Sequence, residues 1–252
     1  MIPILLFISG SIFGSFLHVL AERYGSPTSA FSGRSQCPHC KKTLTPSELI
    51  PIVSYVLSKG KCRGCSEQIS VHYPITELLS GMLAALLLAP PFIVHTSFLI
   101  PTLAYIVACI LIVLIRIDSR LMVLPDGYIV LLTVIATLRM IVSGGSLDDA
   151  LLGALVGSMT IYVIWSVTGG RGIGFGDVKL MIPLGIIFGL RGSITLLFIA
   201  FCIGGFVGTF LLVTKRATGK TAIPFGPFLA GAALILLLAP FVSDRFFAFL
   251  GV

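Results

Sequence analysis

The sequence predicts an all-α polytopic membrane protein with about eight transmembrane helices and a small cytoplasmic zinc-knuckle loop domain. Hydrophobic residues make up 56% of the 252-residue chain, charged residues make up only 11%, and the mean hydropathy is +1.08. These values are far too apolar for a soluble domain of this size. Two further observations are long apolar stretches along the chain and two Cys-x2-Cys pairs in its one sizeable polar segment.

Eight stretches are apolar over a length near the roughly 20 residues that span a bilayer as a helix. They are 2–21, 75–89, 97–117, 125–142, 147–167, 178–190, 194–214 and 224–242. Two of them, 75–89 and 178–190, are short, so we expect their ends to lie in the headgroup region. No Lys or Arg precedes Glu22, so the first stretch lacks the basic region of a cleavable signal peptide and is expected to be retained.

These stretches predict three domains. They are a first transmembrane helix at 1–21, a cytoplasmic loop domain at 22–74 and a seven-helix membrane domain at 75–252. The loop domain is too small to form a stable hydrophobic core without help.

The distribution of basic residues predicts the topology. If the first helix runs inward, the segments 22–74, 116–124, 168–179 and 215–223 are cytoplasmic, and they hold 14 of the 17 Lys and Arg residues. Cytoplasmic loops carry such an excess, so both termini are expected outside. The net charge of +7 is therefore interpreted as orienting the protein in the membrane. No nucleic-acid partner is expected, because no basic stripe with interleaved aromatics is present.

Four cysteines of the loop domain form a Cys-x2-Cys, x21, Cys-x2-Cys array, which is typical of paired zinc knuckles. Four thiolates close a tetrahedral site, so the predicted Zn²⁺ is structural and supplies folding energy to the loop. Disulfides are not expected in a cytoplasmic loop, and a redox pair does not explain two matched motifs. The predicted ligands are Cys37, Cys40, Cys62 and Cys65.

Three acids are expected at the cytoplasmic membrane surface. Asp118 ends the stretch 97–117, where the helix dipole disfavours an anion. Asp177 follows the glycine-rich run 168–176 and precedes the stretch 178–190. Asp126 follows Pro125, and a helix start explains it as well as catalysis does.

Two carboxylates at one depth on separate helices can share a proton and activate a water, as in an aspartic protease. The sequence therefore predicts Asp118 and Asp177 as a catalytic pair. From the helix ends, Asp177 is expected to be the ionised base and Asp118 the proton holder. Glycines beside Asp177 would let an extended substrate backbone approach. The predicted substrate loop comprises Gly174, Phe175, Gly176 and Lys179, and Lys179 is otherwise a snorkelling residue.

The other acids have simpler interpretations. Glu77 is expected in the first turn of the helix 75–89, which favours an anion. Asp148 and Asp149 are expected to serve a solvated turn or helix cap.

Several motifs together resemble the bacterial prepilin peptidases, or type IV leader peptidases. They are Gly174-Phe175-Gly176-Asp177-Val178-Lys179-Leu180, Gly14-Ser15-Phe16-Leu17, the paired cysteines, Glu48-Leu49-Ile50-Pro51 with Ser54-Tyr55, Tyr73-Pro74 with Glu77-Leu78, Ile117-Asp118 with Leu124-Pro125-Asp126, and Pro224-Phe225-Gly226-Pro227-Phe228.

The resemblance implies a membrane aspartic endopeptidase of the bacterial cytoplasmic membrane, with Asp118 and Asp177 as the catalytic pair. Its implied substrates are pilin, pseudopilin or competence precursors, cleaved at the cytoplasmic face just before their hydrophobic helix. Many members also N-methylate the new terminus from S-adenosylmethionine. The chain departs from the family at His18, where asparagine is usual, and the glycine run does not fit a Gly-x-Gly-x-x-Gly template.

Two other functions are weighed against this one. A serine protease would need a nucleophile with a base in reach, and Ser15 with His18 lacks a third orienting group. A zinc-stapled scaffold or ion-coupled transporter would place its acids near the bilayer midplane, whereas Asp118 and Asp177 are expected at helix ends.

Overall fold

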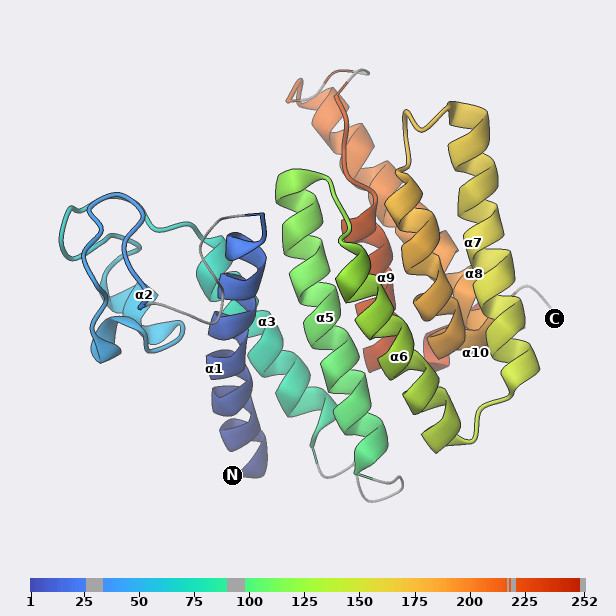
Figure 1. Cartoon of the computed structure of the whole chain (residues 1–252), viewed down its shortest axis with the longest axis horizontal. Coiled ribbons are helices and arrows are strands. Elements are labelled where there is room, and N and C mark those ends of the chain that lie inside the picture. The colour runs from blue at the N-terminus through green and yellow to red at the C-terminus, as the bar shows by residue number, and fades with distance from the viewer. Residues whose placement is uncertain (26–33, 90–97, 217, 219–220, 250–252) are drawn as a thin grey trace. The chain divides into compact units, whose positions relative to one another are not determined.

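The computed structural model describes residues 1–25, 34–89, 98–216, 218 and 221–249. Over these residues the regular secondary structure is helical, and β-structure is limited to two isolated bridges in the cysteine loop. The chain divides into two compact units, Met1–Ser97 and Phe98–Val252 (Figure 1). The structure confirms the all-α fold class.

Unit 1 contains α1 (Ile2–Arg23) and α3 (His72–Leu87), which pack against each other. Small residues permit this close approach. A Cβ atom on Gly10 would lie 2.5 Å from the Cβ of Ala84. The Ser80 hydroxyl donates to the Gly10 carbonyl oxygen at 2.8 Å. Such small-residue contacts are characteristic of helices that associate in membranes.

The loop of unit 1 contains the short helices η1 (Pro46–Glu48) and α2 (Val53–Leu57) between its two cysteine pairs. Glu48 accepts hydrogen bonds from the Thr45 backbone N–H and from the Lys42 ammonium, both at 2.9 Å. The Thr45 N–H first, and Lys42 second, lower the pKa of Glu48 to about 2.

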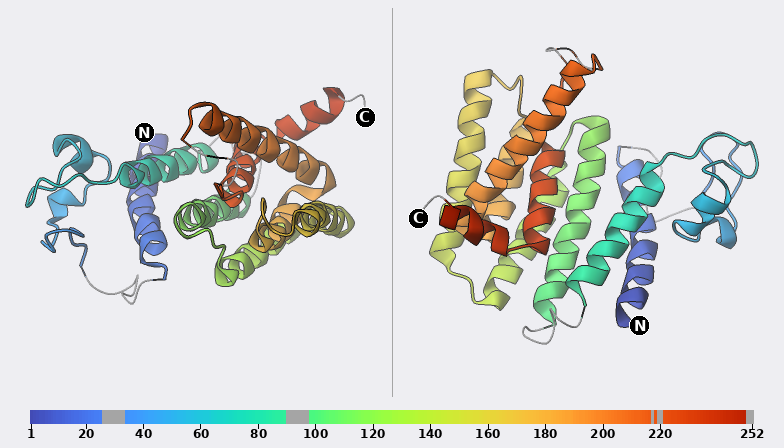
Figure 2. Two further views of the ribbon diagram at one scale, coloured as in Figure 1. Left: turned by 90° about the horizontal axis from the view of Figure 1, so that it is seen from above. Right: turned by 180° about the vertical axis from the view of Figure 1, so that it is seen from behind.

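Unit 2 is a helical bundle in which α8 contacts most of the other helices (Figure 2). Its helices are α5 (Leu99–Leu121), α6 (Asp126–Ser143), α7 (Leu147–Thr168), α8 (Phe175–Val213), α9 (Gly226–Leu238) and α10 (Phe241–Phe249). The helix α5 lies beside α6 and α9, whereas α8 lies beside α6, α7 and α9. About two-thirds of the most apolar 18-residue segment of α5 is buried, so this helix forms the core of the unit.

The helix α8 corresponds to two predicted stretches, 178–190 and 194–214, joined at Gly189. Gly189 has φ 65° and ψ −170°, a conformation open essentially only to glycine. The backbone N–H of Leu190 donates to the Asp149 carboxylate of α7 at 3.1 Å. A Cβ on Gly189 would collide with that same carboxylate. The predicted cap role of Asp149 is thus fulfilled in part at this bend.

Five described helices are long and apolar enough to cross a membrane, or six if α9 and α10, which bend by 100°, count as one span. The predicted stretch 224–242 is therefore divided by a bend. The total of eight spans stays a prediction, because α3 has only 16 residues and α8 combines two helices that meet at the kink of Gly189.

Several predicted bounds differ from the structure. The predicted domain boundary after residue 74 is based on hydropathy and stays a prediction, although contacts group α3 with α1. The expected helix start at residue 97, and residue 220 of a predicted cytoplasmic loop, lie outside the described residues. Glu77 is not in a first turn, since α3 already begins at His72. Pro125 is an N-cap residue rather than the first helical residue of α6.

Candidate active site

The structure brings Asp118 and Asp177 together within unit 2. Asp118 lies in the last turn of α5 and Asp177 in the first turn of α8. Both are almost fully buried, with 5% and 4% of their surfaces exposed. Burial of two acids at helix ends is costly without a functional reason.

Gly226, the first residue of α9, lies between the two carboxylates. A Cβ on this glycine would be 2.5 Å from Asp118 Oδ2 and 3.3 Å from Asp177 Oδ1. The Gly226 backbone N–H donates to Asp118, and the two carboxylates are close enough to repel each other. The absence of a side chain at this position therefore leaves room for both acids.

The two oxygens of Asp177 differ in their surroundings. Oδ2 accepts the backbone N–H of Gly174 at 2.9 Å, as a helix-capping carboxylate does. Oδ1 is buried and has no hydrogen-bond partner among the described residues. An unpaired buried carboxylate oxygen beside a second carboxylate is suited to hold a water molecule or a shared proton.

The helix dipoles act on both acids. Asp177 lies at the N-terminus of α8, and Asp118 faces the N-terminus of α9 although it belongs to the last turn of α5. The positive end of α9 offsets the negative end of α5 at Asp118. Helix ends alone therefore do not separate the roles of the two acids, and the expected assignment of base and proton holder stays a prediction.

The predicted glycine loop is partly helical. Gly174 is the N-cap of α8, and Phe175, Gly176 and Asp177 form its first turn. The predicted start of this helix at residue 178 is three residues late, because the Asp177 carboxylate caps the turn. A Cβ on Gly176 would lie 3.1 Å from the Leu124 Cβ, so this glycine permits close packing.

Lys179 and Asp126 form a pair outside the buried acids. Lys179 Nζ lies 2.8 Å from Asp126 Oδ1, and the Asp126 side chain is 70% exposed. The ammonium also lies 5.6 Å from the ring centre of Phe175, which itself packs 5.3 Å from Trp165. Asp126 thus begins α6 and binds Lys179, apart from the buried acids Asp118 and Asp177.

Two similar hairpins in the loop of unit 1 present the four cysteines. Cys37 donates its backbone N–H to the Lys42 carbonyl oxygen at 3.0 Å, and Cys62 donates to that of Glu67 at 2.9 Å. The fourth residue after each of these cysteines, at positions 41 and 66, has a positive φ. The two motifs therefore fold as equivalent knuckles.

The sulfur geometry fits a tetrahedral zinc ion. The four Sγ atoms lie within 4.8 Å of one another, with 3.9 Å from Cys37 to Cys65 and 4.0 Å from Cys40 to Cys62. Zinc–sulfur bonds of about 2.3 Å place tetrahedral sulfurs about 3.8 Å apart. The donor set and its spacing thus match a structural zinc site.

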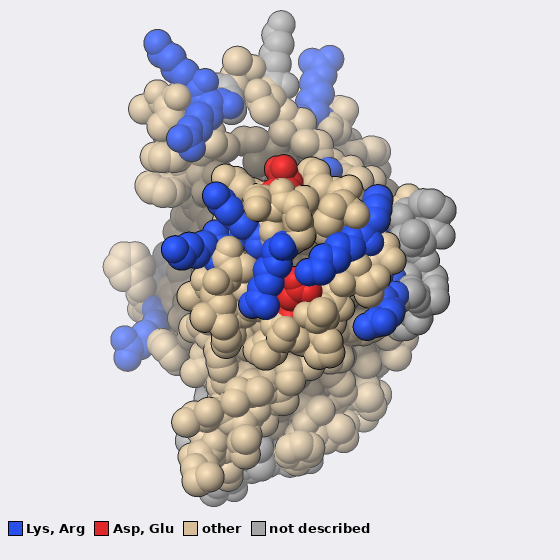
Figure 3. All heavy atoms as spheres, turned by 90° about the vertical axis from the view of Figure 1, so that its left-hand side faces the viewer, with Lys and Arg blue, Asp and Glu red and all other residues tan. Residues whose placement is uncertain are grey.

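The surroundings of the second knuckle favour a thiolate at Cys62, whereas burial and the neighbouring thiols raise the pKa of Cys65. The backbone N–H groups of Cys65 and Gly64 lower the pKa of Cys62 to about 6. Figure 3 shows basic side chains gathered over the face that carries this loop, with fewer acidic ones among them. Positive charge offsets the negative charge of a metal bound by four thiolates.

A buried polar cluster between α1 and α3 contains His18 and Glu77. His18 Nδ1 lies 3.2 Å from the Thr76 hydroxyl, and its ring centre is 3.9 Å from that of Tyr73. His18 is thus a polar contact between helices, the interpretation favoured over a nucleophile with Ser15. Glu77 is 7% exposed and was missed as a buried residue, because the helix start was placed too late.

Glu77 holds a strained turn of the loop. Its Oε2 accepts the backbone N–H of Ile52 at 2.7 Å. Ile52 has φ 60° and ψ −51°, and Val53 N lies 2.5 Å from the Pro51 carbonyl oxygen, as in a classic γ-turn. Such turns are rare for a β-branched residue, and no local sequence signal predicts this one.

Comparisons with known proteins agree with this geometry. Residues 8–90 match the bacterial peptidase A24 N-terminal domain, and residues 105–209 match the type IV leader peptidase family. No solved structure matches the chain significantly.

Curated relatives match over most of the chain. A Bacillus subtilis (strain 168) prepilin leader peptidase/N-methyltransferase is 34% identical over 93% of this chain and 93% of its own length. An Aeromonas hydrophila protein of the same name is 35% identical over 81% of this chain and 71% of its own length. A type 4 prepilin-like proteins leader peptide-processing enzyme from Escherichia coli O78:H11 is 33% identical over 95% of both chains.

Proposed function

Because the chain belongs to the type IV leader peptidase family, we propose that it is a membrane-embedded aspartic endopeptidase that removes the leader peptide of prepilin-like precursors. The observation that carries the proposal is the pair of buried carboxylates, Asp118 and Asp177, on either side of Gly226. Substrates of this class are pilin, pseudopilin or competence precursors.

The pair supports hydrolysis through a shared proton. One carboxylate, ionised, takes a proton from a bound water, whose oxygen attacks the scissile carbonyl carbon. The other, protonated, donates its hydrogen to the carbonyl oxygen, and the leaving amine then receives a proton from the pair. The two acids titrate as a unit, so the roles belong to the pair.

The position of the acids disfavours an ion-coupled transporter or a scaffold. Transporters bind ions near the bilayer midplane, at broken helices. Asp118 and Asp177 instead lie in a last and a first turn, away from the bend of α8 at Gly189.

Single substitutions test the peptidase. Asp118→Asn and Asp177→Asn each remove one member of the pair while they keep its shape, and each should lower the cleavage rate at least about 10³-fold. Asp126→Asn is the matched control, since this exposed acid pairs with Lys179 outside the buried acids, and it should stay within a few-fold of the unsubstituted protein. Cleavage of a purified pilin-type precursor is followed by mass spectrometry. Near-normal cleavage by either of the first two variants would refute the pair.

The relatives' names support a second activity, N-methylation of the new N-terminus, with S-adenosylmethionine as the methyl donor. The N-terminal domain is the proposed location, and His18 is the position at which this chain departs from the family pattern. The same precursor incubated with S-adenosylmethionine should gain the mass of a methyl group. A cleaved product without that increment would contradict this activity and leave the peptidase intact.

The loop domain completes the proposal. A structural Zn²⁺ held by Cys37, Cys40, Cys62 and Cys65 would fold the loop, and the segment 75–252 would form the peptidase domain. The chain is a multi-pass membrane protein. The excess of Lys and Arg in one set of loops supports a bacterial cytoplasmic membrane location with both termini outside and the acids at the cytoplasmic face.

A further inference from the structure

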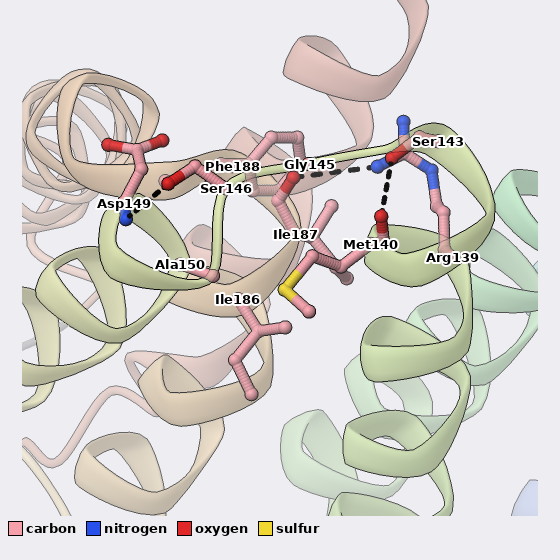
Figure 4. A pocket seen from close by; sticks show the side chains of 11 residues that line it. Arg139, Met140, Ser143, Gly145, Ser146, Asp149, Ala150, Ile186, Ile187 and Phe188 are labelled. Carbon is pink, nitrogen blue, oxygen red and sulfur yellow. Dashed lines mark hydrogen bonds between the residues drawn. The ribbon is translucent and has the colours of Figure 1, made fainter.

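A pocket opens in unit 2 where α6 ends, α7 begins and α8 bends. Its volume is about 120 Å³. Figure 4 shows Arg139 and Asp149 on opposite sides of it, with the apolar side chains of Met140 and Ile186 between them. It lies at the far end of α6 from Asp126, and so away from the catalytic acids.

Arg139 lines the pocket opposite Asp149 but forms no ion pair with it or with another carboxylate of the described residues. Among the described residues, its one hydrogen bond runs from Nη1 to the Ile187 carbonyl oxygen at a long 3.5 Å, and no carboxylate forms an ion pair with it. Its Nε is buried and without a partner there. Because a guanidinium carries five N–H donors, most of its hydrogen-bonding capacity is unused. A partly buried cation of this kind lowers stability unless a ligand supplies an anion and hydrogen-bond acceptors.

Two other polar side chains of the pocket, Asp149 and Ser146, form hydrogen bonds within the protein. The Asp149 carboxylate accepts the Leu190 N–H at the bend of α8. The Ser146 hydroxyl accepts the Asp149 N–H at 3.5 Å, which leaves its own hydrogen free to donate toward a ligand. Arg139 and Ser146 thus offer donors to one oxyanion.

The surface around the pocket is apolar. Large side chains on α6 and α7 beside it are 42% to 65% exposed, and in a membrane they would contact hydrocarbon chains. These residues are Leu138, Ile141, Leu147 and Leu151.

The chemistry of Arg139 suits a phosphate group. A planar guanidinium binds phosphate through two parallel hydrogen bonds.

We propose that this pocket binds the headgroup phosphate of a membrane phospholipid, with Arg139 as its principal ligand and the acyl chains along the exposed face of α6 and α7. The site lies in the leaflet opposite the catalytic acids. Lipid binding there is a separate property from the proposed peptidase activity, since Asp118 and Asp177 do not line the pocket.

Thermal unfolding of the purified full-length protein in detergent tests the proposal. Phosphatidylethanolamine should raise the Tm by about 5–11 °C at a concentration near 100 times its Kd. A diacylglycerol with the same acyl chains, which lacks the phosphate, should cause no comparable rise. Inorganic phosphate at the same concentration should also cause none, because it lacks the acyl chains.

Two variants connect the effect to the pocket. Arg139→Gln removes the charge, and Gly145→Leu fills the pocket while Arg139 stays. Both should lose the lipid-induced rise in Tm. Arg191→Gln is the matched control, because Arg191 packs on the Phe247 ring at 5.3 Å and lines no part of the pocket, and it should keep the rise.

Lipid-free samples separate binding from a structural role. Without lipid, Arg139→Gln should unfold at the same or a higher temperature than the unsubstituted protein, since it relieves an uncompensated buried charge. A large fall in its Tm without lipid would show a structural role and contradict the proposal. An equal rise with diacylglycerol, an equal rise with inorganic phosphate, or a full lipid response in both pocket variants would also overturn it.

Discussion

Substitution of Gly226 by alanine should abolish most of the proposed peptidase activity while the fold persists. The added Cβ would lie 2.5 Å from Asp118 Oδ2 and 3.3 Å from Asp177 Oδ1. Ordinary carbon–oxygen contacts are about 3.4 Å or longer, so the Asp118 carboxylate must move by about 1 Å. It can do so by rotation of a short side chain, which disturbs packing little.

The expected loss follows from that displacement. A 1 Å misplacement of reacting groups costs about 10²-fold in rate, which corresponds to about 2.7 kcal/mol of transition-state stabilisation. Alanine keeps the backbone N–H that Gly226 donates to Asp118, so the loss arises from the position of the carboxylate. Because Pro227 follows, alanine also restricts the backbone locally, and the Tm must be measured alongside.

The assay is single-turnover cleavage of a pilin-type precursor in detergent micelles. Gly231→Ala is the control, because this glycine lies on the same helix and a Cβ there would meet no atom within 4 Å. Cleavage by Gly226→Ala at a rate within a factor of about three of the control would refute the argument, since it would mean that the acids do not act from the observed positions.

Three further outcomes are expected. Cys62→Ser should reduce bound zinc well below about one ion per chain, measured by elemental mass spectrometry, whereas Cys202→Ser should leave it unchanged. Gly153→Leu should lower the free energy of unfolding by about 1–3 kcal/mol through overpacking, because a Cβ there would lie 2.5 Å from the backbone of α8. Gly127→Leu should cause no such loss, because a Cβ at Gly127 would meet no atom within 4 Å. The backbone N–H of Thr45 is the main cause that lowers the pKa of Glu48 to about 2. The ionised Glu48 therefore stabilises the fold above pH 4.5, and this contribution is lost as the pH falls toward 2. Glu48→Gln should make the Tm fall less steeply between pH 4.5 and pH 2.

Local signals in the sequence predicted much of this chain. Hydropathy located most of the helices, and spacing identified four cysteines that the structure gathers around one point. The two acids were recognisable because Asp118 and Asp177 lie directly at the ends of apolar stretches, where an acid has no packing role.

Long-range contacts were not predictable in this way. Gly226 lies in a Pro-Phe-Gly-Pro-Phe motif whose sequence indicates no role, and its place between two acids follows only from the packing of α5, α8 and α9. The carboxylate of Asp149 reaches a backbone N–H 41 positions away. No periodicity specifies such a bond, because it depends on how α7 lies against α8.

The bend at Gly189 also has a mechanical consequence. Asp177 lies 12 residues before it on a single helix, which corresponds to about 18 Å at 1.5 Å per residue. A rotation of that helix by about 3° at Gly189 would therefore shift Asp177 by about 1 Å at the opposite end. The bond from Leu190 to Asp149 restrains this rotation. The position of Asp177 relative to Asp118 therefore depends on a bond between α7 and α8 at the opposite end of that helix from the acids.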